Sequence, residues 1–311
     1  MTLDIITETY NRIKPYITYT PILKSSVLDK MFDCSLLFKC ENFQKVGAFK
    51  ARGAVNAVLT TPKELYQKGF ITHSSGNHGA ALAYAATIVN SKATIVMPSN
   101  APKTKIESVN RYGASIVFCE PTLQSREETM VFIQKESGAT IIPPYNHDEV
   151  ILGQSTCAFE ILNEVNNIDV LLAPIGGGGL MSGTAIATSI ISPRTTIIGA
   201  EPLNACDAFD SLQKGTIQPP KTTTTIADGL RTSLGDKTFP ILQKHLQEIR
   251  LVKEESIIEA MKLIMSILKI VIEPSAAVTI GALIEDSSFI KNKKVAVIIC
   301  GGNVDLTSLP F

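Results

Sequence analysis

One lysine stands in a setting that could give it chemistry. Lys50 lies between Phe49 and small residues in Ala48-Phe49-Lys50-Ala51-Arg52-Gly53, directly after the turn-prone Gly47 and at the start of an apolar helical pattern. A lysine that is held in a pocket and partly desolvated has a lowered pKa and can form a Schiff base. The alternative interpretation is a solvated lysine in the first turn of a helix. These six residues do not decide between the two.

A second motif, Ser74-Ser75-Gly76-Asn77-His78-Gly79, lies between an expected strand and an expected helix. Such a junction presents backbone N–H groups at a helix N-terminus, where an anion such as a carboxylate is stabilised. Ser and Asn are also favoured as N-caps, and Gly permits the turn. The motif therefore fits a helix cap, an anion site, or both at once.

Four consecutive glycines, Gly176–Gly179, follow an expected strand and precede an expected helix. Such a run gives up side-chain packing and leaves the unfolded chain flexible, and close approach of backbone amides to a phosphate would compensate for that cost. The spacing fits neither the dinucleotide-binding fingerprint nor a Walker A motif, because no Lys-Ser/Thr follows. A bare flexible loop is the alternative.

The last expected strand ends in Cys300, followed by Gly301-Gly302-Asn303. Ligands of an open parallel sheet lie beyond the carboxyl ends of its strands. A thiol there can face a ring nitrogen as a weak donor or acceptor, although a lone cysteine often serves as a small buried hydrophobe. Taken together, the lysine, the glycine run and the thiol indicate a cofactor with an aldehyde, a phosphate and a ring nitrogen.

The elements that must position these residues alternate regularly along the chain. Strand, helix, strand, helix at this spacing predicts parallel βαβ units, and those between 70 and 135 could form a subdomain of their own. The expected strands are 35–39, 70–73, 93–97, 115–119, 169–175, 196–200 and 294–300. The expected helices are 3–13, one directly after Lys50, 77–89, 103–112, 122–135, 148–165, 180–190, 254–268 and 275–283.

Composition limits the classes of protein and the compartment. The 311 residues are 45% hydrophobic, with 29 Lys plus Arg and 29 Asp plus Glu, so the formal net charge is zero. This balance argues against nucleic acid as the main partner. The N-terminus lacks the pattern of a secretory signal, and the longest apolar stretch, 263–272, is too short to span a bilayer. Six cysteines without a CxxC pair indicate reduced thiols and a cytoplasmic location.

On these motifs the chain resembles the fold-type II pyridoxal-phosphate enzymes, in the branch of serine racemases and serine/threonine dehydratases. The resemblance implies an α/β fold like that of the tryptophan synthase beta chain, with two open parallel-sheet domains and the cofactor in the cleft between them. It implies a large cofactor-binding domain of residues 1–67 plus 147–311, a small substrate-closing domain of residues 68–146, and a homodimer. The matching segments are 48–53, 73–79, 174–183, 200–207, 226–235, 272–275 and 300–308.

The resemblance also implies a role for each motif. Lys50 corresponds to the Schiff-base lysine, which removes the α-proton on one face of the amino acid. Asn77 would bond the ring hydroxyl of pyridoxal phosphate, Gly176–Gly179 would hold its phosphate, and Cys300 would face its ring nitrogen. Thr232 stands where the branch commonly has a serine. The residues expected to bind the substrate are Ser74, Ser75, Asn77, His78, Gly79, Arg126 and Thr232.

Two positions bear on which reaction is expected. Racemisation requires a proton from the face opposite Lys50, whereas dehydration expels the β-hydroxyl after the same first step. Ser75 supplies a hydroxyl for the first outcome, while many dehydratases resemble this motif with alanine there. Cys300 points the other way, because racemases usually have serine in that place. The prediction is a serine racemase that also deaminates serine to pyruvate; the alternative is an L-serine/L-threonine or 3-hydroxyaspartate ammonia-lyase.

Further ligands follow from the resemblance alone. Glu201, the carbonyl of Ala205 and Asp207 match the divalent-cation site of the racemase branch, and hard oxygen ligands suit Mg²⁺ or Ca²⁺. Without the family, two such carboxylates would be taken for surface charge. ATP activates serine racemases, and Lys45 lies near the corresponding place, although Val46 departs from the polar residue expected next. A non-catalytic sensor is the hypothesis from another class.

Overall fold

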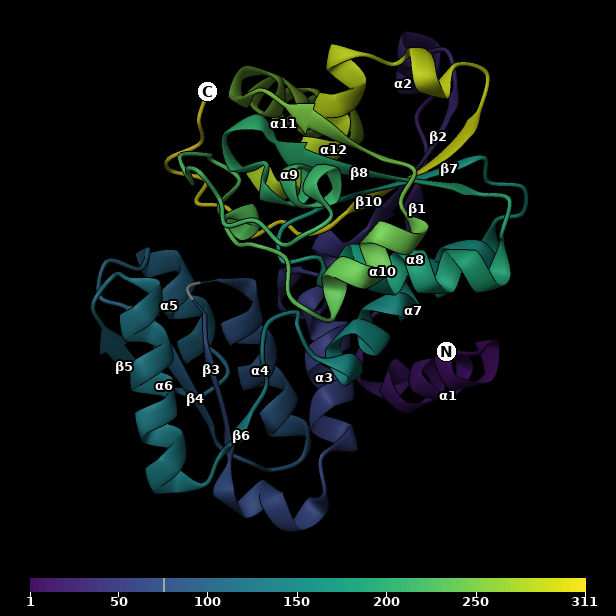
Figure 1. Cartoon of the computed structure of the whole chain (residues 1–311). Helices are drawn as coiled ribbons and strands as arrows, with labels where there is room; N and C mark the ends of the chain where they lie inside the picture. The colour runs from purple at the N-terminus through teal and green to yellow at the C-terminus, as the bar shows by residue number, and fades with distance from the viewer. Residues whose placement is uncertain (75) are drawn as a thin grey trace.

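The computed structural model describes residues 1–74 and 76–311, and it contains two separate β-sheets, each flanked by helices (Figure 1). The larger sheet has the strand order β1-β2-β10-β7-β8-β9. Its first strand pairs antiparallel with the second, and its other neighbours pair in parallel. The strands are β1 Ile22–Leu23, β2 Ser35–Cys40, β7 Val170–Pro174, β8 Thr196–Pro202, β9 Glu248–Val252 and β10 Lys294–Ile299.

The smaller sheet has the order β5-β4-β3-β6, and its neighbouring strands are parallel. Its strands are β3 Phe70–His73, β4 Ala93–Pro98, β5 Ser115–Cys119 and β6 Thr140–Ile141. The helices of this unit are α4 Asn77–Ile88, α5 Lys103–Asn110 and α6 Leu123–Ser137. The predicted alternation of strands and helices over this stretch is confirmed.

Most helices outside the smaller unit lie around the larger sheet, whereas α3 runs beside α4 of the smaller unit (Figure 1). The predicted ones are confirmed to within about two residues as α1 Leu3–Ile13, α3 Lys50–Thr60, α7 Asp148–Glu164, α8 Gly179–Ile191, α11 Glu254–Leu268 and α12 Pro274–Glu285. Three helices were not predicted: α2 Ser26–Phe32, α9 Asp207–Lys214 and α10 Thr238–His245. The strands β1, β6 and β9 were also missed.

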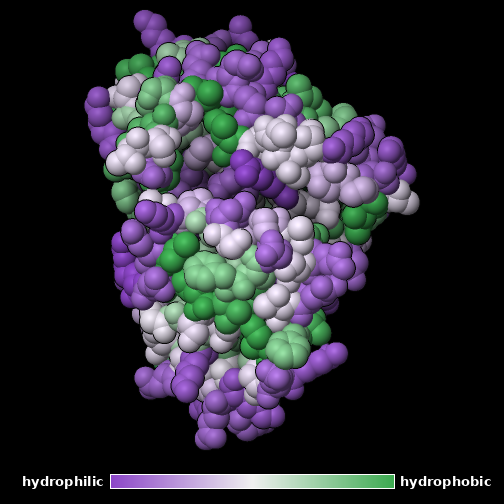
Figure 2. Space-filling view, turned by 90° about the vertical axis from the view of Figure 1, so that its left-hand side faces the viewer, coloured by the Kyte–Doolittle hydropathy of each residue, from purple (hydrophilic) through white to green (hydrophobic). Residues whose placement is uncertain are grey.

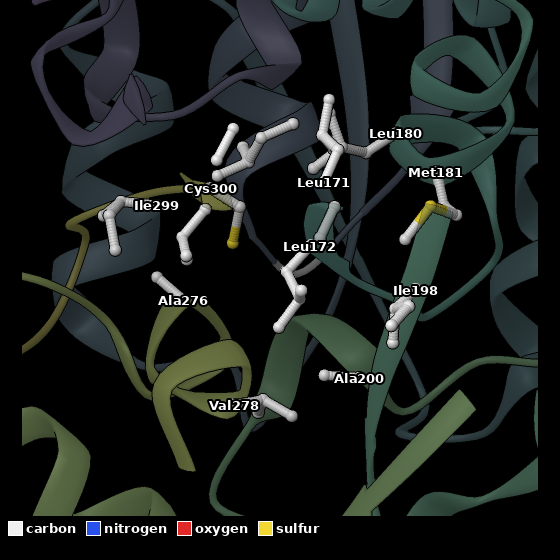
Figure 3. Packing of buried hydrophobic residues seen from close by; sticks show 14 of the residues in the cluster. Leu171, Leu172, Leu180, Met181, Ile198, Ala200, Ala276, Val278, Ile299 and Cys300 are labelled. Carbon is white, nitrogen blue, oxygen red and sulfur yellow. The ribbon is translucent and has the colours of Figure 1, made fainter. Parts of the chain in front are cut away.

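The core of the larger sheet is built from strands that are covered on both faces. In β10, Val295 to Ile299 are all fully buried, as expected for a parallel strand between two helical layers. Figure 3 shows how Leu171 and Leu172 of β7, Ile198 and Ala200 of β8 and Ala276 and Val278 of α12 pack together. Cys300 lies at the end of β10 within the same cluster.

Helix α3, which begins at Lys50, packs closely against α7. A Cβ atom added to Gly153 of α7 would lie 2.6 Å from both the carbonyl oxygen of Arg52 and the Cα of Gly53. On its other side, Val55 and Val58 of α3 share a hydrophobic cluster with Leu82 of α4. The helix that carries the lysine is therefore held by both units.

A buried ion cluster of Lys39, Glu41, Arg52 and Glu160 fixes the first turns of α3. Arg52 donates to Glu41 through Nε at 2.7 Å and to Glu160 through Nη1 at 2.8 Å. The ammonium of Lys39 lies 2.7 Å from Glu160. All four residues are at most 2% exposed. Two cations facing two anions make the cluster neutral, which burial of charges requires.

One face of the molecule is seen in Figure 2, which looks toward the side where β5 and α6 lie in Figure 1. Hydrophobic residues gather on its lower half. Exposed apolar side chains of β5 and α6 include Phe118, Leu123 and Phe132. Among the residues described, no helix is long and apolar enough to cross a membrane.

Candidate active site

Lys50 begins α3 near the place where the two units meet. Its Nζ donates a hydrogen bond of 2.7 Å to the carbonyl oxygen of Pro144, which belongs to the segment between β6 and α7. Burial lowers the pKa of Lys50 to about 8, while nearby Cys300 and Glu273 act in the opposite direction. This environment fits the desolvated lysine and not the solvated one, because a lysine in water titrates above pH 10.

The glycine loop Gly176–Gly179 connects β7 to α8. Gly178 has φ +85°, a left-handed conformation that favours glycine. A Cβ added to Gly177 would lie 2.4 Å from the ring of Tyr145. Among the residues described, no acceptor is found for the backbone N–H groups of Gly176, Gly177 and Gly178. Free amides beside a helix N-terminus fit the phosphate of pyridoxal phosphate.

Asn77, the first residue of α4, is held at both ends of its amide. Its Nδ2 lies 2.9 and 3.0 Å from the two carboxylate oxygens of Glu273, and its Oδ1 accepts a hydrogen bond of 2.9 Å from Asn303 Nδ2. Glu273 precedes α12 and is 4% exposed. Burial raises the pKa of the Glu273 carboxyl, although the hydrogen bond from Asn77 lowers it.

The loop before α4 carries the predicted carboxylate-binding residues. Ser74 Oγ accepts hydrogen bonds from the N–H groups of Gly76 at 3.2 Å and Gly79 at 3.1 Å, so it caps the helix start. His78 Nε2 donates to the carbonyl oxygen of Ile142 at 2.8 Å. Burial, followed by the charge of Lys50, lowers the pKa of His78 to about 3, so the ring is neutral. Ser75 lies outside the described residues.

Cys300 is buried, and its Sγ lies 3.9 Å from Glu273 Oε1. Burial, followed by the charge of Glu273, raises the pKa of the thiol well above its ordinary value. The group at the end of β10 is therefore a neutral thiol. Such a thiol fits the weak, uncharged partner expected for a ring nitrogen.

Two predicted substrate residues have different surroundings. Thr232 Oγ1 is 3.0 Å from the hydroxyl of Tyr145, which lies over the glycine loop. Arg126 Nε donates to the carbonyl oxygen of Thr122 within α6 at 3.3 Å. The charge of Arg126 contributes to the lowered pKa of His73, at the end of β3, although burial is the larger cause. The structure thus places Thr232 beside the glycine loop, and Arg126 within electrostatic range of the strand that leads to Ser74.

The predicted cation ligands lie after β8. Glu201 accepts hydrogen bonds of 2.9 Å from the N–H groups of Ala208 and Phe209. Both carboxylate oxygens of Asp207 are buried without a hydrogen-bond partner among the described residues. Burial raises the pKa of Glu201 to about 9 and that of Asp207 to about 7. An orphaned carboxylate beside a second one fits a divalent cation, with the carbonyl of buried Ala205 as a third ligand. No group of three or more His, Cys, Asp or Glu side chains suited to a metal occurs in the described part of the chain.

An ion pair joins the two units across the site. Lys105 of α5 contacts the carboxylate of Asp228, which precedes the loop that carries Thr232. The Nζ of Lys105 is also 3.7 Å from the position of a Cβ added to Gly76. Burial lowers the pKa of Lys105, and the charge of Glu273 opposes that shift.

Several residues of this site were missed from the sequence. Glu273 and Asn303 hydrogen-bond to Asn77. Lys105 forms the ion pair between the two units, and Tyr145 packs against Gly177. One signal existed for Glu273, since a carboxylate directly before Pro274 marks a helix start. The others depend on contacts between segments far apart in the chain.

The lowered pKa of Lys50, the free amides after β7 and the neutral thiol after β10 together fit an enzyme site for a phosphorylated aldehyde cofactor. The chain belongs to the family of pyridoxal-phosphate-dependent enzymes, whose model matches residues 13–301. It is 44% identical to a beta-hydroxyaspartate dehydratase of Paracoccus denitrificans, over 100% of this chain and 98% of the relative. It is 47% identical to a serine racemase of Arabidopsis thaliana, over 98% of this chain and 93% of the relative.

Among solved structures, maize serine racemase matches with a TM-score of 0.96 and 42% identity, over 98% of this chain and 94% of the maize chain. The fold-type II assignment is confirmed.

Proposed function

We propose that the protein is a serine racemase that interconverts L- and D-serine and also eliminates water from serine, giving pyruvate and ammonia. The observation that carries this proposal is Lys50, which has a pKa of about 8 and donates a hydrogen bond to Pro144 in the segment after β6, as a proton carrier in a desolvated site would. The alternative is an L-serine/L-threonine or 3-hydroxyaspartate ammonia-lyase without racemisation. The dehydratase relative, at 44% identity over the whole chain, supports the ammonia-lyase about as strongly as the racemase relatives support the racemase.

Pyridoxal phosphate, when bound, supplies the electron sink that makes the α-proton of the amino acid acidic. Lys50 and Asn77 would hold it, together with the free amides of Gly176–Gly179 and the neutral thiol of Cys300. A neutral partner at the ring nitrogen does not enforce a positive charge on the ring, which favours prompt reprotonation or elimination.

The chain's own residues then bind the amino acid and move its protons. We assign its carboxylate to the loop of Ser74, Ser75, Asn77, His78 and Gly79 at the start of α4, where backbone N–H groups favour an anion. Arg126 and Thr232 would complete this subsite. Lys50 Nζ would take the α-proton on one face, and the hydroxyl of Ser75 would return a proton on the other. The predicted division into residues 1–67 plus 147–311 and residues 68–146 would let the small unit close over the substrate.

We propose a divalent cation, Mg²⁺ or Ca²⁺, at Glu201, Ala205 and Asp207. The support is the pair of orphaned oxygens on Asp207. Titration calorimetry of the purified protein with Mg²⁺ should show one site per chain that Asp207→Asn removes. A homodimer, a cytoplasmic location and activation by ATP near Lys45 are further proposals that rest on the family resemblance.

The deciding experiment measures D-serine and pyruvate together from L-serine, in wild type and in Ser75→Ala. The racemase proposal predicts that wild type forms both products and that Ser75→Ala loses D-serine while retaining pyruvate. Ser75→Thr, which keeps a hydroxyl, is the matched control. Wild type that forms pyruvate but no D-serine would establish the ammonia-lyase instead, and 3-hydroxyaspartate and threonine assayed in parallel would identify its substrate.

A further inference from the structure

The segment between β6 and α7 contacts several parts of the site. Within residues 142–147, the carbonyl of Ile142 accepts from His78 and that of Pro144 accepts from Lys50. Asn146 then binds the side chain of Asp236 at 2.6 Å and the N–H of Lys237 at 3.0 Å. Tyr145 lies between these contacts and is not among the residues proposed to bind the cofactor, the substrate or the cation.

Tyr145 is fixed from one side by the glycine loop. Its ring lies 2.4 Å from the position of a Cβ added to Gly177, and its own Cβ lies 2.8 Å from that of Gly179. A side chain at position 177 would require the ring to move, and one at position 179 would require the backbone of Tyr145 to move. The ring therefore packs directly on the loop that would hold the phosphate.

The phenol hydroxyl of Tyr145 reaches Thr232, 3.0 Å away and 87 residues further along the chain. Burial raises the pKa of Tyr145, so the phenol stays protonated at neutral pH. A threonine hydroxyl has one hydrogen to give and two lone pairs. If Thr232 gave its hydrogen to Tyr145, it would have none left for a carboxylate, which only accepts.

We propose that Tyr145 is a positioning residue for substrate recognition: its hydroxyl donates to Thr232 Oγ1 and leaves the hydrogen of Thr232 for the substrate carboxylate. The inference rests on the proposed function, since it requires Thr232 to contact an amino acid. It holds for the racemase and for the ammonia-lyase alike, because both bind the same carboxylate.

Tyr145→Phe tests the proposal, because it keeps the ring on the glycine loop and removes only the hydroxyl. We expect the KM for L-serine to rise about 5- to 10-fold, as for one lost hydrogen bond, with kcat within twofold. Cofactor affinity, measured from the visible absorption of the bound cofactor, should stay unchanged. The matched control is Tyr84→Phe, which removes a phenol hydrogen bond of 2.6 Å to Tyr16 outside the site and should leave KM unchanged.

A double-mutant cycle with Thr232→Val separates positioning from packing. If Tyr145 acts through Thr232, Tyr145→Phe adds nothing to the KM of Thr232→Val, whereas Thr232→Ser keeps the sensitivity to Tyr145→Phe. The proposal is overturned if the effects of Tyr145→Phe and Thr232→Val on KM are fully additive, or if Tyr145→Phe leaves KM unchanged. It is also overturned if Tyr145→Phe lowers cofactor affinity by as large a factor as it raises KM. Wild type that converts none of serine, threonine and 3-hydroxyaspartate would overturn the proposed function as well, whereas an active wild type restricts any failure to Tyr145.

Discussion

The side-chain nitrogen of Asn77 lies within 3.0 Å of both carboxylate oxygens of Glu273, although 196 positions separate the two residues. Asn303 occupies the other end of the same amide at 2.9 Å. The start of α4 in the small unit is thereby tied to the start of α12 and to the chain after β10. The nitrogen that faces Glu273 is also the donor that we assign to the ring hydroxyl of the cofactor.

Glu273→Gln should stabilise the cofactor-free protein at pH 8. The folded-state pKa of Glu273 is raised from its ordinary 4.5, so between pH 4.5 and that raised pKa the folded state binds more protons than the unfolded chain. The charged carboxylate therefore lowers stability as pH rises through this range, and the cost vanishes below it. Glutamine keeps an acceptor for Asn77 without the charge, a gain on the order of 1 kcal/mol.

Urea unfolding of the cofactor-free wild type and Glu273→Gln at pH 5 and pH 8 measures this difference. The gain should be larger at pH 8. Glu255→Gln, an exposed change of the same kind on α11, is the control for the substitution itself. An equal gain at both pH values would show that the Glu273 charge is not disfavoured by burial.

Attachment of pyridoxal phosphate to the cofactor-free protein should follow the titration of Lys50. Only the neutral amine attacks an aldehyde, and with a pKa of about 8 about half of Lys50 is neutral at pH 8, against well under 1% for an ordinary lysine. The rate, followed by stopped-flow absorbance from pH 6.5 to 10, should rise about tenfold per pH unit at first and level off above pH 8. A rate that climbs steadily to pH 10 would mean that Lys50 is solvated.

Glu160→Gln should destabilise the protein by about 3–5 kcal/mol, because it leaves Lys39 and Arg52 buried with a single anion between them. Denaturant unfolding of the holoenzyme measures the loss. Asp148→Asn breaks the pair with Lys237, in which both side chains are substantially exposed, and should destabilise the protein far less than Glu160→Gln, because solvent screens an exposed pair. If the two variants lose similar unfolding free energy, the buried ion cluster contributes no more than an exposed ion pair.

Gly177→Ala should weaken cofactor binding, since its Cβ would lie 2.4 Å from the ring of Tyr145 and the loop must shift. A displacement of the amides that we assign to the phosphate should raise the cofactor dissociation constant at least tenfold, measured by absorbance titration. In a Tyr145→Ala background the same change should cost clearly less, because the clash is gone. If the cost is equal in both backgrounds, the clash does not govern the loop.

The parts of this structure that could be predicted from the sequence are those with local signals. The strands β3 and β5 were predicted at their observed bounds, because buried parallel strands are short apolar runs between turn residues. The strands β1 and β6 have two residues each and helices α2, α9 and α10 have seven or eight. Such short elements form because they pack against neighbouring elements, and they contain too few residues to show a recognisable sequence pattern.

The same distinction applies to the site. Lys50, the glycine loop and Cys300 could be found because each follows a turn or ends a strand. Glu273 and Tyr145 act through partners 196 and 87 residues away, and nothing near them in the sequence marks those contacts. Arg52 stood two positions from Lys50 in the quoted motif, yet its role depends on Glu41 and Glu160 from two other elements.

Helix α3 packs against α4 of the smaller unit and α7 of the larger one, so the lysine that it carries lies where the two units meet. The residues assigned to the substrate carboxylate come largely from the smaller sheet, beyond β3 and in α6. Asn77 is assigned both to the cofactor and to the substrate, so attachment of the cofactor and selection of the amino acid meet at the start of α4. Because Thr232 belongs to the larger unit, a variant with another amino-acid specificity needs changes in both units, whereas the buried ion cluster that holds α3 can stay unaltered.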